Sequence, residues 1–419
     1  MSTRVFSILF VTIIFLFPAN VTTTLGIEKL VFSAFEISIA IIGFFVIQDN
    51  MIENNKALRW LLLFVIVFCA SKLLTDKSEG IKALSLTVIC PPLIFAALPQ
   101  IGRHFTVWAR FIYIYKAFFL VECFLSITER VLHRNILTLV EALTENIGGQ
   151  DGFRSYGMVG HPLQNSLVVS TMMTFFLVSN EKYKYWYWGI GLLAVLCFES
   201  RSSIVANVLI LVAYILYLNF DGKRNFYQKL KMNLLLVSLT VMGGITAISL
   251  GLGSRLVKRG LVDDSSAQVR LDIWKIFDRY SLSDFLFGLD FESVELIMVS
   301  MKLSATENFW IDFLFRFGII FIGFMIFLYY KLCKELYKGY SKHKIWFTAS
   351  TFILIASTNN SLSTYWLPLF IFLFSIVLFS HYHLSEIPKP IYLKLRIGVL
   401  RKFFGSTSNK TNDINLRVA

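Results

Sequence analysis

Long, uninterrupted apolar runs constrain the fold of this chain more than any other feature. A membrane-spanning helix needs about 20 consecutive, mostly apolar residues, and twelve segments approach that length. Their apolar residues follow one another without the alternation that the strands of a membrane β-barrel show. Because the bilayer core offers the backbone no hydrogen-bond partners, such runs favour helices. We therefore expect an all-α polytopic membrane protein with about 12 transmembrane helices.

The predicted spans are Val5–Val21, Leu30–Ile47, Ala57–Leu74, Ile81–Leu98, Phe105–Ile127, Leu163–Ser179, Tyr185–Phe198, Ser203–Phe220, Leu234–Gly253, Asn308–Tyr330, Trp346–Ser357 and Trp366–His381. The seventh and eleventh are short, so eleven spans are the alternative count. The first could instead be a signal peptide. An uncleaved span is favoured, because no clear small-residue cleavage site follows it.

Charge supports a membrane location and gives it an orientation. Only 16% of the 419 residues are charged and 56% are hydrophobic, whereas soluble domains carry about 25% charged residues. With both termini cytoplasmic, most basic residues fall in cytoplasmic segments, as the positive-inside rule requires. The net charge of +13 then reflects these segments and not nucleic-acid binding. The five cysteines show no paired spacing, and no metal-ligand cluster or cofactor motif is present.

This orientation gives one transmembrane domain, residues 1–384, and a basic cytoplasmic tail, residues 385–419, that contacts membrane lipids. Two long loops, residues 128–162 and 254–306, lie on the outer face. Long loops are usually functional, so we expect the working residues there.

Two arginines on that face precede or begin helices. Arg154 lies in a glycine-bearing loop that leads through His161 and Pro162 to Asn165. A helix N-terminus behind such a loop binds anions, although an ordinary turn explains the segment equally well. Arg201 opens the next span, where the helix dipole disfavours a cation. It indicates a bound anion, or else it pairs with Glu199 or reaches lipid headgroups.

The late loop and the span after it supply further candidates. Arg259, Arg270 and Trp274 belong to the late loop, and the stretch around Arg270 and Trp274 has the apolar spacing of an amphipathic helix. Arginine forks suit diphosphates. Alternatively, they form a solvated basic face. Glu307 and Asn308 begin a span, and Ser304 with Glu307 also reads as a helix capping box.

Charged residues also occur inside two spans. Asp312 and Arg316 are four residues apart and are expected to pair. Lys116 is expected to face Glu36, Asp312 or a cavity, because an unpaired charge in a span is costly.

Outward-facing arginines, one carboxylate and hydroxyl-rich turns fit glycosyl transfer from a lipid diphosphate. Arginines would stabilise the leaving pyrophosphate without a metal, and a carboxylate would act as the base on the acceptor hydroxyl. Composition alone does not separate such an enzyme from a transporter of lipid-linked sugars.

The order of these motifs resembles the bacterial O-antigen polymerase/ligase superfamily, which contains the Wzy-type polymerases and the O-antigen ligases. The Arg154–Asn165 segment, the Ser200-Arg201-Ser202 turn and Arg270 with Trp274 and Phe287-Gly288 are similar to family elements. The ligases carry His-Asn, nine residues and then Gly. Here Glu307-Asn308 precedes Gly318 at the same spacing, which favours a polymerase.

The resemblance implies a membrane-embedded glycosyltransferase (GT-C-like) architecture with a large periplasmic loop in the bacterial inner membrane. The implied substrates are undecaprenyl-diphosphate-linked oligosaccharides, joined by an inverting, metal-independent reaction, and a chain-length regulator is a potential partner. The predicted catalytic residues are Glu307 and Arg201, and Arg154, Arg270, Arg259 and Arg316 would bind diphosphate. The other predicted substrate contacts are His161, Asn165, Asn308 and Trp274. The alternatives are an O-antigen ligase and a lipid-linked sugar transporter or flippase.

Overall fold

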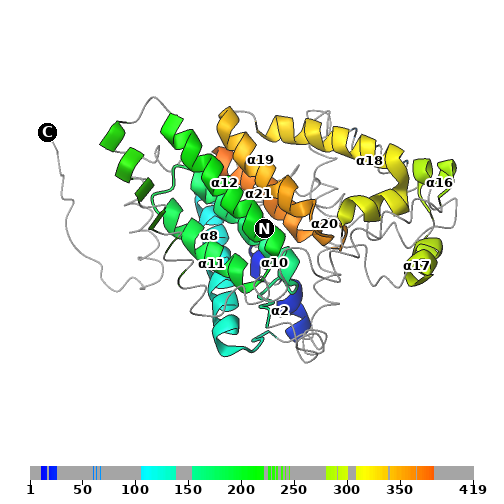
Figure 1. Cartoon of the computed structure of the whole chain (residues 1–419), viewed down its shortest axis with the longest axis horizontal. Helices are drawn as coiled ribbons and strands as arrows, with labels where there is room; N and C mark the ends of the chain where they lie inside the picture. The colour runs from blue at the N-terminus through cyan, green and yellow to red at the C-terminus, as the bar shows by residue number, and fades with distance from the viewer. Residues whose placement is uncertain are drawn as a thin grey trace, which may run out of the picture. The chain divides into compact units, whose positions relative to one another are not determined.

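A computed structural model of the chain describes residues 11–16, 18–25, 105–137, 153–220, 280–289, 291–300, 308–337, 340–364 and 366–381, with isolated positions near 60–67 and 225–245. These residues belong to one compact unit within Met1–Tyr382. Every regular element among them is a helix (Figure 1). The predicted tail and the predicted spans Leu30–Ile47 and Ile81–Leu98 lie outside the described residues.

The helices and their bounds are α2 (Ala19–Thr24), α8 (Phe105–Leu132), α10 (Pro162–Val178), α11 (Lys184–Cys197), α12 (Arg201–Phe220), α16 (Leu282–Phe287), α17 (Phe291–Ser300), α18 (Phe309–Leu336), α19 (Lys342–Ala356), α20 (Ser361–Thr364) and α21 (Leu367–His381). Seven of them, α8, α10, α11, α12, α18, α19 and α21, occupy segments predicted as spans. The apolar runs therefore located these helices correctly.

Three helices, α8, α12 and α18, are long and apolar enough to cross a membrane, and α10 and α21 are shorter apolar helices. This supports membrane association. The total of about 12 spans remains a prediction.

Helix α10 lies at the centre of the helix packing. It contacts α8, α11, α12, α19 and α21, and every residue in it except Leu163 is buried. Small hydroxyl side chains line its boundary with α12: Ser166 Oγ lies 2.9 Å from Ser203 Oγ. Asn207 of α12 donates to Ser170 Oγ at 2.7 Å. Such small and polar groups allow close approach between membrane helices and join them by hydrogen bonds.

A cluster of aromatic rings packs α21 and the N-terminal helical residues 11–16 against each other and against α8. Phe15 packs edge-on against Phe118 of α8, with ring centroids 4.9 Å apart, and also contacts Phe374 of α21. Tyr115 of α8 hydrogen-bonds Ser375 of α21 at 2.6 Å. The many phenylalanines of this chain thus form interhelical contacts as well as apolar surface.

One end of these helices is marked by lysines and exposed aromatic rings, and we call it the lysine–aromatic end. It contains Tyr183, Lys184, Trp186 and Trp346. Trp186 and Trp346 are 69% and 73% exposed, and the Lys184 ammonium lies 5.3 Å from the Tyr185 ring centroid. Exposed tryptophan and tyrosine are typical of membrane–water interfaces.

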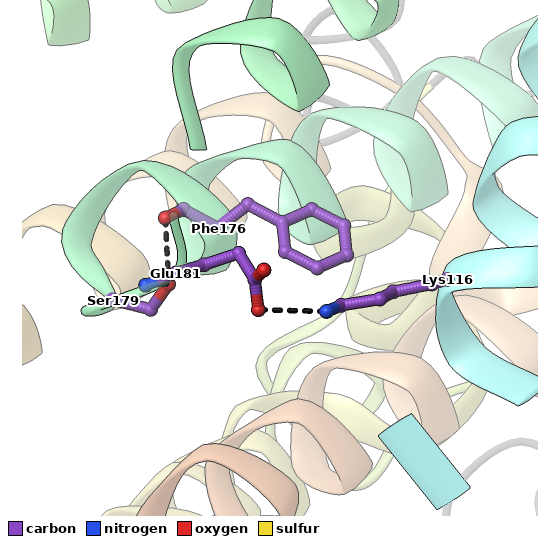
Figure 2. Close-up of polar contacts among 4 residues, drawn as sticks. All are labelled: Lys116, Phe176, Ser179 and Glu181. Carbon is purple, nitrogen blue, oxygen red and sulfur yellow. Dashed lines mark hydrogen bonds and ion pairs between the residues drawn. The ribbon is translucent and has the colours of Figure 1, made fainter. Parts of the chain in front are cut away.

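A partly buried ion pair lies near the same end (Figure 2). Lys116 of α8 contacts Glu181, in the turn between α10 and α11, with Nζ and Oε2 2.7 Å apart. Lys116 thus has a carboxylate partner other than the expected Asp312, which pairs with Arg316, and the other expected partner, Glu36, lies outside the described residues. The partner of Lys116 comes from a turn about 65 residues away in sequence, which helix periodicity alone does not reveal.

Helix α18 bends sharply at Gly318, where φ is 77°. Figure 1 shows the bend beside α16. The backbones meet here: a Cβ on Gly318 would overlap the Leu286 carbonyl, and one on Gly288 would lie 2.6 Å from the Arg316 carbonyl. Leu289 N donates to Phe315 O at 2.6 Å. The contact requires glycine on both sides, because only glycine tolerates this conformation and this approach.

An apolar cluster completes the contact between α17 and the first part of α18. Val294, Ile311 and Phe315 are buried in it, and Tyr280 packs on Phe315 with ring centroids 5.4 Å apart. Burial raises the pKa of the Tyr280 phenol above its ordinary value. We call α16, α17 and residues 309–318 the glycine-docked cap.

Candidate functional site

The loop that carries Arg154 is bound to two carboxylates of α8. Glu129 accepts hydrogen bonds from the backbone N–H groups of Tyr156 at 2.8 Å and Gly157 at 3.0 Å. It also accepts from Ile136 N at 3.0 Å. Glu122, two turns earlier, accepts from Met158 N at 2.8 Å. The amides of this glycine-bearing loop are therefore engaged by carboxylates of the protein itself.

Gly157 is the closest point between the loop and α8. Its φ is +54°, and a Cβ there would overlap Glu122 Oε1 and lie 2.7 Å from Asn165 Nδ2. Glycine is favoured here for two reasons: the backbone is left-handed, and no space remains for a Cβ atom.

Arg130 joins this loop to the turn between α11 and α12. Its guanidinium donates to the Phe153 carbonyl and forms an ion pair with Glu199, with Nη2 and Oε1 3.0 Å apart. The two side chains are only 4% and 1% exposed. Ser155 N also donates to Cys197 O at 3.2 Å. Arg154 and Arg201, both partly buried, therefore extend from two segments that Arg130 fastens together.

Glu199 has a left-handed backbone, with φ of 52°. Non-glycine residues rarely adopt this conformation, and the buried ion pair holds it here. The sequence offered Glu199 as a partner of Arg201, and the structure shows an ion pair of Glu199 with Arg130.

The start of α10 is capped within the chain. His161 is the N-cap and its Nδ1 accepts from Leu163 N at 3.3 Å, with Pro162 at a position that favours proline. Asn165 N donates to the His161 carbonyl at 3.0 Å, and the Asn165 side chain donates to the Tyr156 carbonyl. His161 and Asn165, predicted to contact substrate, thus have structural contacts that shape this turn.

Asn308 caps α18 and ties it to the turn after α19. Its Oδ1 accepts from Trp310 N at 2.9 Å, and its Nδ2 donates to Ser357 O at 3.2 Å. Trp310 Nε1 donates to Ser357 Oγ at 2.9 Å.

The expected pair between Asp312 and Arg316 is confirmed, with Oδ1 and Nε 3.0 Å apart. Arg316 belongs to the glycine-docked cap, beside the contact between Gly288 and Gly318. Glu307, Arg259, Arg270 and Trp274 lie outside the described residues, so their predicted roles stay predictions.

Sequence reasoning missed Glu122, Glu129 and Arg130. Part of their signal was present: Glu122 lies inside the predicted span Phe105–Ile127, and Glu129, seven residues later, falls on the same helix face once α8 continues to Leu132. What the run could not show is the loop, about 30 residues later, that supplies the N–H donors.

We call the Arg130 cluster, with Glu129, Glu199 and residues 153–161, the polar end. Glu122 lies beside it, and Arg154 and Arg201 belong to the two segments that Arg130 joins. Among the described residues no group of histidine, cysteine, aspartate and glutamate side chains could hold a metal ion. No protein-family model, curated protein or solved structure matches the chain.

Proposed function

We propose that this chain polymerises undecaprenyl-diphosphate-linked oligosaccharide repeat units into a surface polysaccharide at the periplasmic face of a bacterial inner membrane. The observation that carries the proposal is Arg130, which holds the segments of Arg154 and Arg201 together. The amino-acid sequences of these two segments also resemble elements of the O-antigen polymerase/ligase superfamily, which is an observation separate from their contact in the structure. A pair of fixed guanidinium groups suits a diphosphate, which they bind and stabilise as it leaves.

The length of α11 supports a lipid-linked substrate. Its residues from Lys184 to Cys197 rise about 21 Å, whereas the hydrocarbon core is about 30 Å thick. With the lysine–aromatic end at the cytoplasmic headgroups, the polar end would lie at or below the opposite boundary, since α12, which begins there, is long enough to span the core. A diphosphate attached to a lipid would reach arginines at that depth without leaving the membrane.

In this proposal Arg201 and Arg154 bind the donor diphosphate, with Arg270, Arg259 and Arg316 as further contacts, and Glu307 acts on the acceptor hydroxyl. The start of α18 at Asn308, the residue after Glu307, would bring the carboxylate to the same face. The glycine contact between α16 and α18 fixes the position of that helix start.

The test is a deletion strain complemented with Arg201→Ala. We expect loss of polymer, with the variant still present in the membrane at the wild-type level, because one diphosphate-binding charge is gone. Arg110→Ala is the matched control: Arg110 is an exposed arginine near the other end of α8, and its loss should leave polymer length unchanged. Normal chain length in the Arg201→Ala strain would refute the assignment.

The same strains separate the alternative, an O-antigen ligase. Without a polymerase, lipid A-core carries a single repeat unit. Without a ligase, long polymer accumulates on its carrier lipid.

A lipid-linked sugar transporter is the second alternative, and one observation favours it: α18 is interrupted at Gly318, and transporters use interrupted helices at their sites. Purified protein that makes polymer from a synthetic lipid-linked repeat unit would exclude a transporter. Transport of that unit across vesicles without product would favour one.

A further inference from the structure

Glu122 differs from the other acidic residues of the polar end in its surroundings. Its side chain is fully buried in α8. Oε2 accepts a hydrogen bond from Met158 N at 2.8 Å, but Oε1 has no hydrogen-bond partner. Among the ion pairs of the described residues, none includes Glu122. One of its two oxygens is therefore an unsatisfied acceptor in a buried place.

A second unsatisfied acceptor lies beside it. Asn165 is also fully buried, and its Oδ1 has no hydrogen-bond partner while its Nδ2 donates to the Tyr156 carbonyl. Asn165 Nδ2 and Glu122 Oε1 both lie against Gly157, within 3 Å of the position that a Cβ would take there. Two neighbouring buried side chains thus each have one acceptor atom that lacks a donor.

Glu129 provides the contrast on the same helix face. Its Oε1 accepts from Ile136 N, and its Oε2 accepts from Tyr156 N and Gly157 N. Three N–H donors and no unsatisfied oxygen make an environment that stabilises an ionised carboxylate. Glu122 has one donor, and burying an ionised carboxylate without further partners is very costly.

We propose that Glu122 is a proton-binding site: it is a neutral carboxylic acid that gives its O–H to the Asn165 carbonyl oxygen beneath the Arg154 loop. One proton removes the buried charge and supplies the missing donor. The titratable groups that interact with it, Glu129 and Cys123, both belong to α8. When Glu122 is protonated, the loop contacts one negatively charged carboxylate of α8, that of Glu129, and not two neighbouring ones.

The direct test is infrared difference spectroscopy on the full-length protein in lipid nanodiscs. We expect a protonated-carboxyl C=O stretching band that shifts in D₂O and disappears in Glu122→Gln. The matched controls, Glu129→Gln and Glu199→Gln, should keep it. Absence of the band in the wild-type protein, or its persistence in Glu122→Gln, would overturn the proposal.

Thermal stability gives a second readout. Glutamine mimics a neutral acid, with its carbonyl on Met158 N and its amide N–H as a donor at the former Oε1 position. We therefore expect Glu122→Gln to melt within about 2 °C of the wild-type protein, and Glu129→Gln to melt about 4 °C or more lower, because an amide N–H would oppose backbone donors. Equal losses in the two variants would contradict a neutral Glu122.

The same samples test whether a sodium ion, and not a proton, is bound at Glu122. The proton-binding site predicts that replacing KCl by NaCl leaves the melting temperature of the wild-type protein unchanged. A rise with NaCl in the wild-type protein that is absent in Glu122→Gln would show a bound sodium ion and would overturn the proposal.

Discussion

The polar end and the glycine-docked cap both hold a loop or short helix against a long helix, but they do so by different forces. At the polar end, buried carboxyl and guanidinium groups of α8 bind backbone N–H and C=O groups of residues 153–158. In the cap, two glycines let backbones touch, and an apolar cluster surrounds them. The first contact depends on charge and hydrogen-bond direction, whereas the second depends on shape. We therefore expect each contact to be disrupted by a different kind of substitution.

Removing the charge of Arg130 should have the largest effect. Arg130→Gln leaves Glu199 buried without its ionic partner, and breaking a buried pair in this way costs about 3–5 kcal/mol. We expect a large fall in melting temperature, measured for the detergent-solubilised protein.

Two controls accompany this measurement. Arg110→Gln, at an exposed arginine of the same helix, should leave the melting temperature unchanged. Adding Glu199→Gln to Arg130→Gln should recover much of the loss, because no charge then remains unpaired. Without that recovery, the contribution of Arg130 would not be electrostatic.

A single methyl group should break the cap. Gly318→Ala forces a side chain into a left-handed backbone, which costs about 1–3 kcal/mol, and the added Cβ would overlap the Leu286 carbonyl. Gly323→Ala is the matched control, because Gly323 lies in the same helix with open space around its Cβ position. We expect it to be neutral or to stabilise by up to about 1 kcal/mol. Similar melting temperatures for the two variants would contradict the glycine contact.

The smallest effect is expected where the cap itself contains a charge pair. Asp312→Asn removes the ion pair with Arg316, whose side chain is 25% exposed. Pairs four residues apart on a helix contribute about 0.2–0.5 kcal/mol, and salt weakens them. The change in melting temperature should be slight and should shrink further at high ionic strength. A fall in melting temperature as large as that of Arg130→Gln would contradict this prediction, because the pair would then contribute as much as the buried ion pair at the polar end.

The sequence was sufficient wherever local pattern decides structure. Apolar runs located α8, α10, α12 and α18, Pro162 indicated the start of α10, and the spacing of Asp312 and Arg316 indicated their pair. It was insufficient where residues distant in the chain choose partners. Lys116 pairs with Glu181, and Glu129 binds amides of residues 156 and 157, because helix packing brings those segments together. The bend at Gly318 likewise arises from the docking of α16, which no periodicity within α18 records.

The burial of α10 on all sides has a consequence for how the protein is assembled in the bilayer. Alone in lipid, this helix would expose Ser166, Ser170 and Asn165 to hydrocarbon chains that offer no hydrogen bonds. Its association with α12 replaces those exposed groups by pairs such as Ser166 with Ser203. In a bilayer, insertion and folding would therefore be coupled for α10, because its polar groups find partners only when the neighbouring helices are present.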